Sequence, residues 1–240
     1  MRSLAVLRLL LAASVMLHAG VGRAESCTDA PKNAAPRKMR LDLGKPSEVF
    51  PGRLLVPADG TELPAVGADG SMIAQLFNDE EDHTGAPVTT LMVWSRSGKL
   101  LGRYALFGIP DNDAHDAQVL HDANALLGKT HWRPLAVHRV CDADRSALPL
   151  DDVTVTFDAD AQRLAIVRGG KPTAVAARFP PPGSRFSSDG GGECGSVLGL
   201  DSGFGGKAIG LVVVTPAVSF GGHSCVGGIS AGFALAIPVR

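Results

Sequence analysis

Short runs of apolar and β-branched residues, separated by polar residues, recur along much of the chain. Three such runs cover residues 71–77, 88–95 and 99–107. Because the side chains of a strand alternate between its two faces, each run predicts a β-strand. The dipeptide Ser-Gly at positions 97–98 suits a tight turn, so residues 88–107 predict a hairpin.

A second hairpin is predicted further along the chain. Residues 152–157 alternate apolar side chains with threonine, and residues 163–168 form a similar run beyond a polar loop. This alternation is typical of strands that have one face in a core. Further strands are predicted over residues 208–215 and 228–239, which are also rich in apolar residues.

A single helix is predicted over residues 111–127. Pro110 and Asp111 are typical of a helix start, and Gly128 is typical of a helix end. The apolar positions between them form only a narrow stripe. A narrow stripe predicts a helix that covers a sheet from outside rather than one inside the core.

Residues 66–74 and 91–98 share the features of a known repeat. The first segment contains an Asp-Gly turn followed by a strand, and the second contains a hairpin that carries Trp-Ser. Together they resemble one blade of the propeller repeats found in exported bacterial proteins, and the resemblance implies paired strands there. A propeller repeats its blade around a ring, whereas no second stretch of the sequence contains both elements. The predicted fold class is therefore mainly β, with antiparallel strands in a sandwich-like or irregular propeller-like array and one short helix.

Composition divides the chain after residue 24 into two parts. Residues 25–53 contain four prolines and several basic residues, which predicts a tether or partly ordered leader. We expect this leader to settle onto the domain only near Val49 and Phe50. Residues 54–240 are predicted to form a single β-rich domain. Within it, the density of glycine over residues 183–206 predicts a mobile loop.

The first 24 residues have the three parts of an export signal. Arg2 and Arg8 precede a compact apolar run at 9–17, and the small residues Gly22 and Ala24 follow it. This order predicts a signal peptide that is cleaved after Ala24. The mature protein is then expected in the periplasm or outside the cell.

Two other interpretations of the N-terminal segment are less favoured. A membrane anchor needs roughly 20 apolar residues, and this run meets His18 and Arg23 sooner. A lipid anchor on Cys27 is disfavoured by the charged residue Glu25 beside it. We therefore expect no membrane span in the mature protein.

The charge of the mature chain bears on its partners. Removal of the signal takes away three of the 23 basic residues and none of the 24 acidic ones, which leaves a net charge of −4. Binding to a nucleic acid backbone needs a basic face. The expected partner is therefore a protein or a carbohydrate rather than a nucleic acid.

Four cysteines follow the predicted cleavage point: Cys27, Cys141, Cys194 and Cys225. An even number of cysteines in an exported chain predicts disulfides. We rank the pairing of Cys27 with Cys141 and of Cys194 with Cys225 first. The alternative is a zinc site, since His138 and His223 lie close to two of the cysteines, but the closely spaced cysteine pairs typical of zinc sites are missing from the sequence.

Two short motifs resemble those of serine hydrolases. Ser230, in Gly-Ile-Ser-Ala-Gly, has the flanking glycines of a nucleophile elbow, but neither an acidic residue nor a histidine follows it. Ser202, in Asp-Ser-Gly, resembles the serine segment of trypsin-like proteases, but His138 lies too close upstream for an architecture of two barrels. Neither motif predicts catalysis.

Two acidic clusters are candidate metal sites. Calcium binds through several hard oxygens, and the candidate ligands are Asp79, Glu80, Glu81, Asp82, Asp111 and Asp113. A simpler interpretation is a solvated loop in the first cluster and stabilisation of the helix dipole in the second. His115 with Asp111 and Asp122 forms a further candidate on one face of the predicted helix, for metal binding or acid–base chemistry.

These observations favour an exported non-enzymatic module that binds a protein or a carbohydrate. The predicted binding elements are the Gly-rich loop and the acidic loops, and calcium is the one cofactor that the sequence suggests. The alternative is an exported hydrolase or metal-dependent enzyme that uses His115 or the acidic loops. Trp94 and Trp132 are expected to anchor the core, because large side chains are scarce in this chain.

Overall fold

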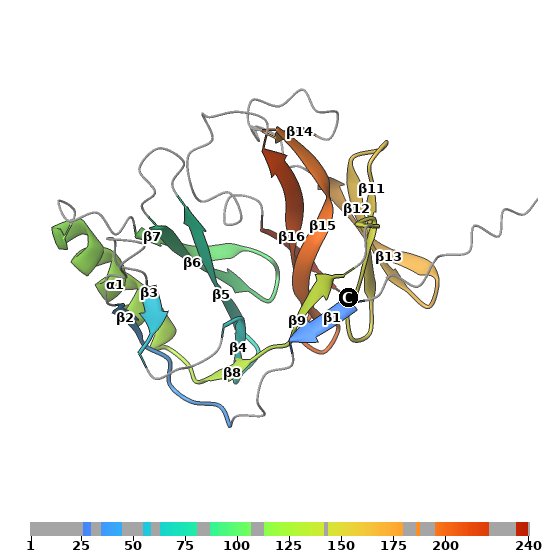
Figure 1. Ribbon diagram of the computed structural model, residues 1–240. Coiled ribbons are helices and arrows are strands. Elements are labelled where there is room, and N and C mark those ends of the chain that lie inside the picture. Colours follow the sequence, from blue (N-terminus) through green and yellow to red (C-terminus); the bar gives the residue numbers. More distant parts are fainter. Residues whose placement is uncertain are drawn as a thin grey trace, which may run out of the picture.

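The computed structural model describes residues 26–29, 35–44, 55–58, 63–80, 87–106, 113–141, 144–179, 186–187, 195–220 and 234–239. These residues form a mainly β fold with antiparallel strands and one helix, as the sequence predicts (Figure 1). One described strand pair is parallel. The predicted signal peptide lies outside the described residues.

A five-stranded sheet follows the order β7-β6-β5-β4-β8. Its strands are β4 (Ala65–Gly67), β5 (Met72–Glu80), β6 (Pro87–Ser95), β7 (Leu100–Leu106) and β8 (Trp132–Pro134). Strands β6 and β7 are the predicted hairpin, and Gly98 has a φ of 79° in the turn between them. The local turn signal therefore identified this hairpin correctly.

A six-stranded sheet contains segments from both ends of the chain. Its main path is β1-β9-β15-β16-β17, and β14 pairs with β15 outside this path. The strands are β1 (Ser26–Asp29), β9 (Val137–Val140), β14 (Phe186–Ser187), β15 (Gly195–Gly206), β16 (Leu211–Phe220) and β17 (Leu235–Pro238). Strand β16 overlaps the strand predicted over residues 208–215, and β17 lies within the stretch predicted over residues 228–239.

The remaining elements are a four-stranded sheet, a strand pair and a helix. The sheet consists of β10 (Ala147–Pro149), β11 (Thr154–Asp158), β12 (Arg163–Arg168) and β13 (Lys171–Arg178) in sequence order. Strands β11 and β12 are the second predicted hairpin. The strand pair is β2 (Leu41–Leu43) with β3 (Leu55–Pro57), and the helix is α1 (Asp113–Leu127).

The six-stranded sheet lies between the other two large sheets (Figure 1). Val212 and Val214 of β16 belong to a core shared with the four-stranded sheet. Leu211 and Val213 belong to a second core shared with the five-stranded sheet. Because successive side chains of a strand point to opposite faces, this continuous apolar run is buried on both sides.

The five-stranded sheet is also covered on both faces. Met92 and Trp94 of β6 face the six-stranded sheet, whereas Leu91 and Val93 join a third core with α1 and the β2–β3 pair. The helix therefore covers a sheet from outside, as its narrow stripe predicts. Trp94 and Trp132 are both buried, which confirms their predicted role as core anchors.

The predicted tether at 25–53 is wrong for the segments that the structure describes. Strand β1 belongs to the six-stranded sheet, and Met39 and Leu41 are buried in the core beside α1. Lys38 and Arg40 alternate with these two residues and are exposed. The basic residues thus mark the outer face of an extended segment that packs on the domain.

The predicted Gly-rich loop is wrong over residues 195–206, which form β15. Strand β15 pairs with β16 along its length and has two register irregularities. At Gly205, which has a φ of 101°, a Cβ atom would lie 2.1 Å from the carbonyl oxygen of Leu211. Position 205 therefore needs a glycine because the backbone of β16 lies too close for a side chain, and not because the segment is mobile.

Helix α1 is fixed to β2 and β8 by side-chain hydrogen bonds. The backbone N–H of Leu41 donates to Oδ1 of Asn124 (2.7 Å), and Nδ2 of Asn124 donates to the carbonyl oxygen of Leu41 (3.0 Å). The indole N–H of Trp132 donates to the carbonyl oxygen of Leu127 (2.7 Å), in the last turn of the helix. These bonds satisfy backbone groups that burial would otherwise leave unpaired.

Replacing Gly205 with alanine tests whether close contact explains the glycine content of β15. Gly205→Ala is expected to lower the free energy of unfolding by about 1 kcal/mol through its φ angle and by a further ~1–3 kcal/mol through overlap with Leu211. Gly170→Ala is the matched control, because Gly170 also has a positive φ but would place its Cβ in open space. Urea unfolding of both variants measures the difference, and equal losses would contradict the explanation.

Replacing Asn124 tests the attachment of α1 to β2. Asn124→Ala leaves the N–H and carbonyl of the buried Leu41 without these partners, so it should lower the free energy of unfolding by ~1–3 kcal/mol. Gln118→Ala, which removes an exposed amide from the same helix, should change it by less than about 0.5 kcal/mol. If thermal or urea unfolding shows the same effect for both, Asn124 does not hold β2 in place.

Candidate functional site: a pocket between two sheets

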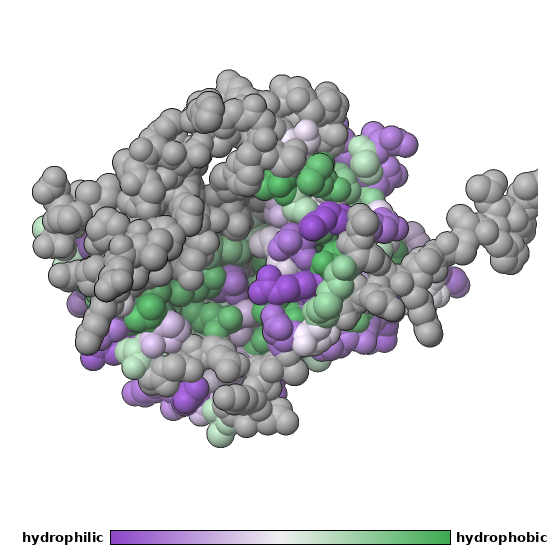
Figure 2. Space-filling model, viewed as in Figure 1, coloured by the Kyte–Doolittle hydropathy of each residue, from purple (hydrophilic) through white to green (hydrophobic). Residues whose placement is uncertain are grey.

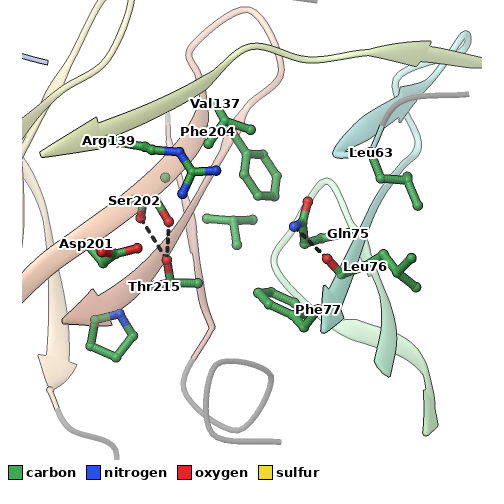
Figure 3. A pocket seen from close by; sticks show the side chains of 13 residues that line it. Leu63, Gln75, Leu76, Phe77, Val137, Arg139, Asp201, Ser202, Phe204 and Thr215 are labelled. Carbon is green, nitrogen blue, oxygen red and sulfur yellow. Dashed lines mark hydrogen bonds between the residues drawn. The ribbon is translucent and has the colours of Figure 1, made fainter. Parts of the chain in front are cut away.

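A pocket of about 290 Å³ lies between the five-stranded and six-stranded sheets (Figure 3). Figure 2 shows hydrophobic and hydrophilic residues side by side on the face of the molecule where these sheets meet. The residues that line the pocket are Leu63, Gln75, Leu76, Phe77, Val137, Arg139, Asp201, Ser202, Gly203, Phe204, Val213, Thr215 and Pro216. The two walls come from segments far apart in the sequence.

The pocket forms where the apolar packing between the two sheets becomes polar. On β5, Gln75 occupies the same face as Ile73 and Phe77, which belong to the core between the sheets. On β16, Thr215 continues the row of Leu211 and Val213 in the same way. Gln75 thus interrupts the apolar row on β5, and Thr215 ends the apolar row on β16 that faces it.

An irregularity in β15 brings two consecutive side chains to the pocket. Leu200 pairs with Pro216 and Ser202 pairs with Thr215, so Asp201 is an extra residue in this strand. Such a β-bulge redirects side chains that would otherwise alternate between faces. Asp201 and Ser202 therefore both line the pocket.

The hydroxyl groups of Ser202 and Thr215 are hydrogen-bonded to each other (Figure 3). Thr215 Oγ1 also donates to the carbonyl oxygen of Ser202 at 3.2 Å. A hydroxyl has one proton, and Thr215 uses its proton for the bond to the carbonyl oxygen of Ser202. The hydrogen bond between the two hydroxyls is therefore donated by Ser202 and accepted by Thr215. Both oxygens keep lone pairs that can accept a hydrogen bond.

Two ion pairs hold the charged groups of the six-stranded wall. Nε of Arg139 donates to Oδ2 of Asp29 at 3.2 Å, and the two residues lie on the neighbouring strands β9 and β1. Asp201 lies 3.5 Å from Nη1 of Arg145. Among the described lining residues, the pocket thus contains one guanidinium and one carboxylate, each with an ionic partner outside the lining.

Gln75 contributes a buried acceptor to the opposite wall. Its Nε2 donates to the backbone carbonyl oxygen of Leu76 at 2.8 Å, which fixes the orientation of the amide. Its Oε1 is buried and has no hydrogen-bond partner within the described part of the chain. A buried carbonyl without a partner costs about 1–3 kcal/mol of stability, so a bound N–H or O–H group would be favourable there.

The strand that carries Asp29 is attached to the sheet at its edge. Cys27 and Cys141 form a disulfide with their Cα atoms 5.9 Å apart, which is the pairing ranked first from the sequence. The same bond excludes Cys141 as a ligand in the zinc alternative, whose other candidate ligands His223 and Cys225 lie outside the described residues. Cys194 and Cys225 lie outside the described residues.

His138 lies on the other face of β9 from the pocket. It is buried, with Nδ1 3.2 Å from Oγ1 of Thr28 and Nε2 3.3 Å from Oδ1 of Asp151. It is the cross-strand neighbour of Gly203 rather than of Ser202. The geometry therefore gives Ser202 no histidine partner among the described residues, and the trypsin-like interpretation of its motif has no structural basis there.

The acidic clusters differ in part from the sequence-based expectation. Asp79 and Glu80 belong to β5 rather than to a loop, because they pair with Val88 and Pro87. Their side chains, that of Asp113, and all of Glu81, Asp82 and Asp111 lie outside the described parts of the structure. Ser230, in the proposed nucleophile elbow, and His223 also lie outside them.

The helix does not combine its polar residues into a site that the structure describes. His115 and Asp122 of α1 are both exposed, and Asp122 accepts a hydrogen bond from Gln118 (2.9 Å). Among the described residues, no three His, Cys, Asp or Glu side chains are grouped closely enough to hold a metal ion. Four of the residues that line the pocket, Asp201, Ser202, Gly203 and Phe204, lie in the segment 183–206 that the sequence predicts as a binding element, whereas the other lining residues carry no such prediction.

Comparisons with family models, curated proteins and solved structures give no match to this chain. Among the described residues, α1 is too short and too polar for a helix that crosses a membrane. The chemistry of the pocket is therefore the basis for a functional assignment.

Proposed function

We propose that this protein is an exported, non-enzymatic module that binds a carbohydrate in the pocket between the two sheets. The observation that carries the proposal is the buried Oε1 of Gln75, an acceptor without a described partner in a wall that is otherwise apolar. A sugar hydroxyl can supply the missing donor. Opposite it, Asp201 and the hydroxyls of Ser202 and Thr215 offer further groups for hydrogen bonding.

The size and lining of the pocket suit a single sugar residue. Its volume of about 290 Å³ is at the lower end of the range of ~300–1,000 Å³ that is usual for ligand sites. Phe77 and Phe204 provide apolar surface for the C–H groups of a sugar ring. A mixed lining of this kind orients a ligand through a few polar groups and desolvates the rest.

The same residues favour binding over catalysis. Because Thr215 donates to the carbonyl oxygen of Ser202, the hydroxyl proton of Ser202 is assigned to its bond with Thr215, and His138 lies on the other face of its strand. A serine nucleophile needs a base within hydrogen-bond reach. The hydrolase alternative therefore gains no support from this pocket.

Export is part of the proposal. The Cys27–Cys141 disulfide joins two exposed residues, and such bonds persist in oxidising compartments. The N-terminal pattern of basic, apolar and small residues supports the same location. We expect exported protein to begin at Glu25, and N-terminal sequencing of secreted or periplasmic material that still begins at Met1 would refute this expectation.

The pocket can be tested with one substitution that separates binding from stability. Gln75→Leu removes the unpaired carbonyl at nearly constant volume, so the melting temperature should stay the same or rise. Loss of one hydrogen bond should weaken sugar binding by about 2–10-fold. Calorimetric titration with glucose, galactose and their uronic acids measures affinity, and Gln118→Leu on the exposed face of α1 is the control.

The outcomes of this experiment are distinct. Weaker binding with unchanged or higher stability supports the pocket as the ligand site. Unchanged affinity in Gln75→Leu would place the sugar elsewhere on the protein. If no sugar of the panel binds the wild-type protein, the carbohydrate-binding function is rejected.

A further inference from the structure

Arg139 presents the free end of its guanidinium to the pocket. Figure 3 shows this group extending from β9 toward the space between Phe204 and Ser202. A guanidinium has five N–H donors, and the Nε–H is used by Asp29. The four N–H groups on the two terminal nitrogens have no protein acceptor within the described part of the chain.

The geometry of these donors selects a particular kind of ligand group. Two parallel N–H groups of a guanidinium match the two oxygens of a carboxylate, and the charged pair is stronger than a neutral hydrogen bond. Asp29 occupies the Nε edge and lies on β1, outside the pocket lining. It therefore holds the guanidinium in place without occupying the end that faces the ligand.

Gln75 and Asp201 both offer hydrogen-bond acceptors to the pocket, and they lie on opposite walls. A ligand that satisfies both must therefore have donors on two sides. Oε1 of Gln75 is on the wall formed by β5, whereas Asp201 is on the wall formed by β15. A sugar ring carries hydroxyls on several carbons and can donate to both walls. The single ammonium group of a free amino acid reaches only one of them while its carboxylate remains on Arg139.

We infer that the ligand is an acidic sugar of the uronic acid class, whose carboxylate binds the terminal nitrogens of Arg139 and whose hydroxyls donate to Gln75 and Asp201. This inference rests on the proposed carbohydrate-binding function and specifies its ligand. Asp29 is a positioning residue for Arg139. Its place is fixed by the pairing of β1 with β9 and by the Cys27–Cys141 disulfide.

Sugars that share the same ring but differ in charge test whether the negative charge of the ligand, rather than its shape, determines binding. Calorimetric titrations use glucuronate, its methyl ester and glucose, and repeat the series with galacturonate, its methyl ester and galactose. The free acid is expected to bind at least about tenfold more tightly than the ester or the neutral sugar. Its affinity should also fall as salt is added, because the ion pair is partly exposed.

Variants of the protein test the assignment to Arg139. Arg139→Gln should remove the preference for the acid, so that the acid, its ester and the neutral sugar bind this variant with similar affinity. Asp29→Asn should reduce the preference only in part, because Arg139 keeps its charge. Arg168→Gln, which removes an exposed arginine from β12 of the four-stranded sheet, is the control and should leave both affinities unchanged.

The result also shows which of the two proposals fails. Equal binding of acid, ester and neutral sugar, or a preference that survives in Arg139→Gln, overturns the acidic ligand and leaves the carbohydrate site intact. Glutamate is titrated beside these sugars, and tighter binding of glutamate than of any sugar overturns the sugar class in favour of a zwitterion. The absence of binding by every sugar rejects both the inference and the proposed function.

Discussion

Burial of two stacked sheets on both of their faces is the constraint on which this fold depends. The five-stranded sheet separates the layer of α1 from the six-stranded sheet, which in turn packs on the four-stranded sheet. Leu211 and Val212 illustrate the result, since neighbouring residues of one strand belong to different cores. A one-residue slip of β16 would exchange the two sets of side chains, so both cores specify the same register.

The pocket is a consequence of this double packing. Where the rows on β5 and β16 remain apolar, the sheets pack together, and where Gln75 and Thr215 enter these rows, the packing becomes polar. The bulge at Asp201 adds a carboxylate that regular alternation would have turned away. The buried Oε1 of Gln75, which has no partner among the described residues, lowers the stability of the fold, and natural proteins keep such costs mainly at functional positions.

The parts of the fold that the sequence predicted are those with local signals. The β6–β7 and β11–β12 hairpins and α1 each carry their own turn, alternation or end residues. Strand β2 was not predicted, because the basic residues Lys38 and Arg40 just before it obscure the alternation of the buried Met39 and Leu41 with exposed residues. Strand β15 was missed because the need for Gly205 arises from the backbone of the neighbouring strand, which no local pattern reveals.

The candidate site was harder to predict, because Arg139 and Asp201 come together through the long-range pairing of β9 with β15, and Gln75 meets them only through the packing of the two sheets. One available signal was the single amide in the row of Ile73 and Phe77, on the face that otherwise packs in the core. The motif around Ser202 did direct attention to the right segment, but for a chemistry that the position of His138 does not support. A sequence motif thus pointed to a segment of the candidate pocket without predicting the chemistry of that pocket.

The connectivity of the six-stranded sheet has a consequence for the way in which the chain folds. Strand β1 pairs with β9, and β9 pairs with β15, so segments from the beginning, middle and end of the chain must meet before this sheet is complete. Folds dominated by such distant contacts fold slowly, since the entropy of closing long loops is lost before the contacts form. For a chain that is exported as proposed, slow folding therefore prolongs the unfolded state after synthesis, in which the polypeptide has to cross the membrane.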